Sequence, residues 1–185
     1  MINFNLSQLP HVIRLSQDCR VTMLAHCQRK LSGENYLPAE DHDHKAFGLL
    51  GGRITNEVIE VINCQPLLHN ARQSDIHKDY MDRMMAAHAL PSITPFTERG
   101  WVASPDELTR VLQSYRKLNL ILIGTYHMHR VPWEQDQVRD KPTALDTILG
   151  GSSRLMMFIV SMVNPANPIL RAFYEGDTNR EFPIH

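Results

Sequence analysis

The hydrophobic and polar positions of the chain divide it into short apolar runs and longer amphipathic segments. Apolar runs bounded by polar or turn residues are typical of strands, and they occur at residues 11–15, 46–50, 57–63, 118–124, 156–163 and 169–175. Residues 51–53 and 55–56 are turn material between the second and third runs, which predicts a hairpin. We expect residues 177–185 to form a polar tail.

Four segments have helical periodicity or signals for the start of a helix. Ser16 can cap a helix that runs to about residue 31, with Cys19 and Cys27 on its apolar stripe. Ser104 caps a second helix, with Pro105 at its first position, that runs to about residue 118. Residues 74–89 and 144–150 are the other two helical segments. In the first of these, the residues Ile76, Tyr80, Met84 and His88 form a stripe. We expect this stripe to pack against the protein or, as a second interpretation, to contact a partner.

The fourth apolar run leads into a pair of histidines. The sequence Tyr126-His127-Met128-His129 ends this run, and residues i and i+2 of a strand point to the same side. Three acidic residues follow, and then a pattern at residues 142–146 that predicts a helix start. Two imidazoles and one carboxylate are a common ligand set for zinc with one open position. The chain has 10 histidines, and an Asp near a helix start is also ordinary capping chemistry, so the pattern alone leaves both interpretations open.

The composition is that of a globular protein, and the length favours one domain over residues 1–185. The formal net charge is -1, which gives no cationic surplus for non-specific nucleic-acid binding. The apolar runs are too short to cross a membrane, and we see no signal-peptide pattern. The three cysteines form no paired motif, which favours a reduced, cytoplasmic setting.

The His-x-His strand and the segment after it resemble the JAMM signature of MPN-domain zinc metallopeptidases. In that family, His-x-His is followed by a short loop and Ser-x-x-Asp; here His127-Met128-His129 is followed by Thr143-Ala144-Leu145-Asp146. Residues 47–51 resemble the G-L-L-x-G strand of the family, and residues 155–161 and 170–173 its closing strand pair. The resemblance covers roughly residues 13–174.

This resemblance implies the fold class and the domain organisation. It implies an α/β fold, a single MPN (cytidine-deaminase-like) domain with a curved mixed sheet flanked by helices. Relative to the family pattern, the chain has insertions near residues 33–45, 71–100 and 130–141. Trp133, in the third insertion, is expected either to contact substrate or to anchor its loop.

The resemblance also implies a zinc ion bound by His127, His129 and one Asp. Two registers compete for the third ligand. Without a gap Asp140 is at the usual distance from His129, whereas a six-residue insertion makes Asp146 the ligand and lets Thr143 supply the motif hydroxyl. We favour Asp146, because Thr143 keeps that hydroxyl. In the family this group would donate a hydrogen bond to the oxyanion.

The catalytic acid of the family is less certain here. The family places a Glu three residues before the Gly of its G-L-L strand, and this chain has Lys45 there. Glu40 matches the Pro-x-Glu pattern that normally carries this acid, if residues 41–45 are inserted after it. Either Glu40 loops back to the site as the catalytic base, or the acid is missing.

The resemblance implies two functions, between which the sequence does not decide. The first is hydrolysis of amide or isopeptide bonds in a protein or peptide substrate, such as a ubiquitin-like or sulfur-carrier protein. The second is a catalytically silent MPN domain that acts as a protein-binding module. Retention of both histidines favours the first, and Lys45 favours the second.

Overall fold

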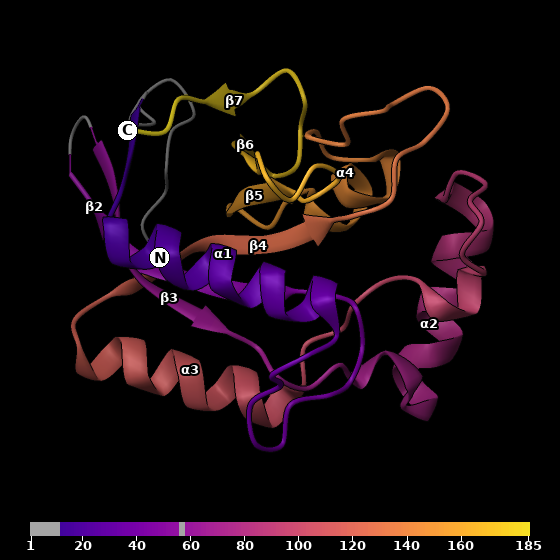
Figure 1. Ribbon diagram of the computed structural model, residues 1–185. Helices are drawn as coiled ribbons and strands as arrows, with labels where there is room; N and C mark the ends of the chain where they lie inside the picture. Colours follow the sequence, from indigo (N-terminus) through magenta and orange to yellow (C-terminus); the bar gives the residue numbers. More distant parts are fainter. Residues whose placement is uncertain (1–11, 56–57) are drawn as a thin grey trace.

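The computed structural model describes residues 12–55 and 58–185, and within them the chain forms a mixed α/β fold (Figure 1). One sheet contains the strands β1 (Val12–Leu15), β2 (Phe47–Ile54), β3 (Val58–Pro66), β4 (Ile121–His129), β5 (Met156–Ser161), β6 (Ile169–Tyr174) and β7 (Glu181–Phe182). The helices are α1 (Gln17–Ser32), α2 (Asp75–His88), α3 (Pro105–Lys117) and α4 (Ala144–Gly150), with short 3-10 turns η2 (Ala71–Gln73) and η3 (Phe96–Glu98). The predicted α/β class is therefore confirmed. None of the helices in the described part of the chain is both long and apolar enough to cross a membrane.

The strands lie in the order β1-β3-β2-β4-β5-β6-β7, which places β4 at the centre of the sheet. β4 pairs antiparallel with β2 and parallel with β5. A parallel pair needs a crossover connection. The connection from β4 to β5 contains α4, and this brings the start of α4 near the end of β4 (Figure 1).

The sheet curves until its two edges nearly meet. The backbone N–H of Ile13 donates to Pro183 O at 3.0 Å, and that of His185 donates to Ile13 O at 2.8 Å. The prediction of a polar tail at residues 177–185 is therefore wrong, because this segment contains β7 and reaches β1. Its apolar residues alternate with polar ones, and Phe182 and Ile184 pack against the main core.

Helices α1 and α3 cover opposite faces of the sheet. Consecutive residues of a strand point to opposite faces, and β2 uses this alternation. Leu50 belongs to the core that includes Met23 of α1, whereas Leu49 belongs to the core that includes Val111 of α3. Both faces of the central strands are therefore buried, which fits their nearly continuous apolar sequence.

The hairpin between β2 and β3 is longer than the sequence pattern predicts. Gly51 and Gly52 lie inside β2, at a register shift against β3, and do not belong to a turn. A Cβ at Gly52 would lie 1.8 Å from Glu60 O, and a Cβ at Gly51 would meet the ring of Tyr115 at 2.8 Å. These glycines permit close packing within the strand, a role that a local pattern does not distinguish from a turn.

Helix α2 packs on the protein through a different stripe from the predicted one. Met81 and Met85 are its buried residues, whereas Ile76 is 85% exposed and Tyr80 48% exposed. The correct face is offset by one residue from the predicted stripe. The Met-rich sequence of α2 is apolar on more than one side, so its periodicity does not define the orientation.

Glu40 belongs to a buried ion-pair network on α1. Its carboxylate accepts hydrogen bonds from Arg29 Nε at 2.8 Å, Arg29 Nη2 at 3.2 Å and Leu37 N at 2.8 Å, and Lys30 Nζ lies 3.5 Å away. Burial by itself raises the pKa of Glu40, but the bonds from Arg29 and Leu37 and the charge of Lys30 outweigh it, so the pKa is lowered. These contacts attach the 33–45 loop to α1.

We expect Glu40→Gln to destabilise the fold by about 3 kcal/mol at pH 7, because Arg29 loses its carboxylate partner while Lys30 keeps only Asp43. A lowered pKa contributes stability above the ordinary pKa of Glu, and this contribution is lost as the pH falls through the folded-state pKa. The difference between variant and wild type should therefore shrink towards acidic pH. Urea unfolding at several pH values measures this. Glu34→Gln, at an exposed position of the same loop, is the control.

Candidate metal centre

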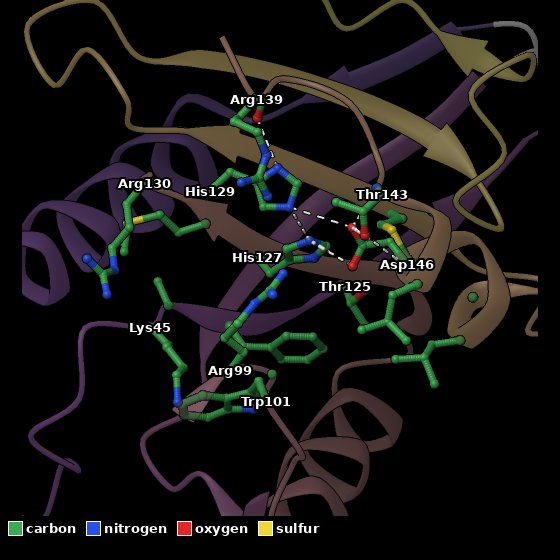
Figure 2. Close-up of a pocket in the computed structure, with 18 of the residues that line it drawn as sticks. Lys45, Arg99, Trp101, Thr125, His127, His129, Arg130, Arg139, Thr143 and Asp146 are labelled. Atoms are coloured by element: carbon green, nitrogen blue, oxygen red, sulfur yellow. Dashed lines mark hydrogen bonds and ion pairs between the residues drawn. The ribbon is translucent and has the colours of Figure 1, made fainter. Parts of the chain in front are cut away.

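The end of β4 and the start of α4 bring three potential metal ligands together (Figure 2). His127 lies opposite Phe47 of β2 and beside Ile159 of β5, so its backbone is fixed from both sides. His129 is two residues further along the same strand and points to the same side. Asp146 is in the first turn of α4. The structure thus brings His127, His129 and Asp146 together, as the sequence predicts.

The spacing of these side chains suits a small cation. His127 Nε2 lies 3.1 Å from His129 Nε2, and the Asp146 oxygens lie 3.4 Å from the first nitrogen and 3.6 Å from the second. Ligands at zinc bond lengths in a tetrahedral arrangement are about 3.3 Å apart. The three residues therefore fit a zinc ion, with one ligand atom from each.

The ring of His129 is held in the tautomer that a metal requires. Its Nδ1 lies 2.9 Å from the carbonyl oxygen of Arg139, which only accepts hydrogen bonds, so Nδ1 carries the proton. Burial lowers the pKa of His129 and favours the neutral ring, although the hydrogen bond to Asp146 opposes this. Nε2 therefore presents its lone pair to the centre, the arrangement seen in histidines that bind metals.

Thr143 positions the carboxylate of Asp146. The backbone N–H and the hydroxyl of Thr143 both donate to Asp146 Oδ2 at 2.7 Å, and Asp146 N donates to Thr143 Oγ1 at 3.2 Å, which makes a capping box. Burial alone raises the pKa of Asp146, but His127 and His129 hold it well below its ordinary value. Asp146 is therefore a fixed, ionised carboxylate that could bind a metal. The hydroxyl that we expected to face an oxyanion is hydrogen-bonded to this carboxylate.

The competing Asp140 lies in a different network. Its Oδ2 pairs with Arg171 Nη1 at 3.0 Å, and Arg171 also pairs with Glu181 of β7. The structure therefore places Asp146, and not Asp140, beside the histidines.

A cavity of about 430 Å³ opens onto the three ligands. Its walls are mainly apolar, and they include Met81, Met85, Leu145 and Trp133. Glu40 is not among the lining residues, and its carboxylate is bonded to α1, so the structure gives no support to Glu40 as the catalytic base.

The cavity is lined by more basic residues than sequence reasoning indicated, namely Lys45, Arg99, Arg130 and Arg139. Lys45 stands at the position where the resemblance to the JAMM family predicts a Glu, and burial lowers its pKa despite the opposing charge of Asp43. The arginines are in segments that we classified as insertions. No local pattern indicates that these loops fold back over the centre, so the sequence alone could not identify them as site residues.

Comparison with known proteins identifies a similar fold but no family. No family model matches the chain, and no curated protein matches it. The chain is similar to the solution structure of the protein DSY2949 from Desulfitobacterium hafniense, with a TM-score of 0.61 and 23% identity. The alignment covers 94% of this chain and 92% of that one. At this identity the likeness concerns the fold alone, a mixed α/β arrangement around a curved sheet.

We expect the purified protein to contain about one equivalent of zinc, and His127→Ala to lose it, because two remaining ligands bind zinc weakly. Elemental analysis of untagged protein measures this. His88→Ala removes an exposed histidine on α2 and should leave the metal content unchanged. Equal metal content in both variants would contradict the site.

We expect Thr143→Val to weaken zinc binding about 10- to 100-fold, because Asp146 loses the hydroxyl that orients it. Thr143→Ser retains this hydroxyl and should bind zinc as the wild type does. A competition titration with a chromophoric chelator measures both affinities. If Val and Ser variants bind zinc equally, the hydroxyl has no role at the metal.

Proposed function

We propose that the protein is a zinc-dependent hydrolase of amide or isopeptide bonds, of the MPN/JAMM type. The proposal rests on one observation: the convergence of His127 Nε2, His129 Nε2 and the Asp146 carboxylate at the mouth of a cavity. The sequence pattern around these residues and the curved mixed sheet are consistent with it.

Bound zinc would lower the pKa of a water ligand and polarise a carbonyl group. The protein side chains supply the rest of the site. His127, His129 and Asp146 would hold the ion from one side, which leaves the cavity side for water and substrate. The mainly apolar lining would strengthen electrostatic interactions within the cavity.

Lys45 would have a different role from the catalytic base that the resemblance predicts at its position. As a half-buried cation in the cavity wall, it would stabilise the negative charge that develops on the substrate oxygen. Glu40 has a structural role on α1 in this proposal.

The same residue favours a second candidate function. With a lysine at the family's Glu position, a zinc site can persist without hydrolysis, and the protein would then be an MPN-type binding module for a protein partner. The two candidates share the metal centre and differ only in turnover.

The substrate in the first candidate is a protein or peptide, such as a ubiquitin-like or sulfur-carrier protein with an attached group. A cavity of about 430 Å³ is in the range of small-ligand pockets and far below the volume of a folded domain. Only an extended segment of such a substrate would therefore enter it.

We expect zinc-loaded protein to cleave amide-linked fusions of ubiquitin-like proteins, and chelated protein or His127→Ala not to. Glu40→Gln should keep its turnover per folded molecule. Lys45→Met should lower kcat about 100-fold, as expected for loss of one group that stabilises the oxyanion. Mass spectrometry of the products measures cleavage.

Lys45→Glu separates the two candidates. If the wild type binds zinc but cleaves nothing and Lys45→Glu gains activity, the protein is a binding module whose metal site lacks only the catalytic carboxylate. If neither cleaves any fusion while both bind zinc, the hydrolase proposal is wrong.

A further inference from the structure

Two arginines from separate loops meet at one tryptophan in the cavity wall. Arg99 follows η3 in the 71–100 segment, and Arg139 lies in the 130–141 loop. The Cζ of Arg139 lies 3.4 Å from the centre of the Trp133 ring, and that of Arg99 lies 5.9 Å from it. Such contacts fix the plane of a guanidinium group and its direction.

Neither guanidinium forms a salt bridge to a carboxylate among residues 12–55 and 58–185. The carboxylate of Asp136 accepts a hydrogen bond from the backbone N–H of Arg139 at 2.8 Å. Some arginines of the chain are paired, for example Arg72 with Asp82 and Arg171 with Asp140. Arg99 and Arg139 therefore lie in the cavity wall without a salt bridge in the described part of the chain.

The hydrogen bonding of Arg139 is also incomplete. The residue is only 7% exposed, yet its Nε has no hydrogen-bond partner within the described structure. Only Nη1 donates, to Val131 O at 3.0 Å. An unsatisfied buried cation is costly to the fold, and this cost is offset if a ligand supplies the missing acceptor.

The two arginines lie near the candidate metal ligands. Both line the cavity; burial lowers the pKa of each guanidinium and the charge of Asp146 opposes this, joined for Arg139 by the charge of Asp136. Figure 2 shows the Arg99 side chain extending in the direction of His127, while Arg139 lies above His129. In the proposed site Asp146 binds the metal ion, and the ion neutralises its negative charge. The positive charges of the two arginines are then not neutralised by Asp146 and can attract an anionic group of a substrate.

We propose that Arg99 and Arg139 bind a carboxylate of the substrate beside the bond that is cleaved. This inference rests on the proposed function, which places the scissile amide at the metal. Planar guanidinium groups match the two oxygens of a carboxylate, and the carboxylates nearest an amide bond are a C-terminal carboxylate and an acidic side chain. The arginines would select substrates in which one of these follows the cleaved bond.

Two matched probe pairs test the proposal. N-acetyl-alanyl-alanine and its amide differ only in the terminal carboxylate, and the amides of N-acetyl-alanyl-glutamate and N-acetyl-alanyl-glutamine differ only in a side-chain carboxylate. The protein has two tryptophans, so the indole N–H signal of Trp133 in NMR titrations reports binding at this place. Titrations of the purified protein before and after treatment with a chelator separate binding by the arginines from binding by the metal.

We expect the acid of at least one pair to bind about tenfold more tightly than its neutral partner, with and without metal. Arg99→Gln should abolish this preference. Arg110→Gln, on an exposed part of α3, should not. Because Arg139→Gln can destabilise its loop, Arg139→Lys is the second variant: it keeps the charge but loses the planar fork, and should reduce the preference.

Each outcome supports or overturns the inference. A preference within the first pair identifies a C-terminal carboxylate, and one within the second identifies an acidic side chain. Equal affinity for the two members of each pair overturns the inference. Tight binding of inorganic phosphate, without measurable binding of either acidic probe, also overturns it. A preference that persists in a protein without hydrolytic activity means that the inference holds and the proposed hydrolase does not. Hydrolytic activity without a preference for the acidic probes means that the proposed hydrolase holds and the inference about the arginines does not.

Discussion

The hydrogen bonds between Thr143 and Asp146 are the interaction on which the site depends. They cap α4, and they also fix the carboxylate that faces the two histidines of β4. The start of α4 and the candidate metal centre therefore share the same two residues, and a shift of one would displace the other. The parallel pairing of β4 with β5 sets this arrangement, because the crossover between them contains α4.

The charges around the cavity come from the loops. The sheet and α4 supply the ligands, whereas Arg99 and Arg139 come from segments outside the regular core. A rigid scaffold with variable loops is a common division between chemistry and selectivity. In this protein the candidate metal ligands lie on β4 and α4, and the arginines lie in loops.

The sequence was sufficient for the elements that have strong local signals. The apolar run of β4 and the alternation of His127 and His129 predict a strand with two side chains on one side, and the structure agrees. The position of Asp146 followed from the helix-start pattern at Thr143. Gly51 and Gly52 were misassigned, because a glycine that permits close packing has the same local appearance as one in a turn. The places of Glu40 and Arg139 depend on how long loops fold back, which no short-range pattern determines.

The near-closure of the sheet has a consequence for folding kinetics. β1 forms its outer hydrogen bonds with residues 183–185, so a pairing near one end of the described chain waits for segments near the other. Contacts between residues so distant in sequence raise the contact order and slow folding. During synthesis, the edge of β1 stays unpaired on that side until residues 183–185 have left the ribosome. In that interval the exposed strand edge is open to association with other chains.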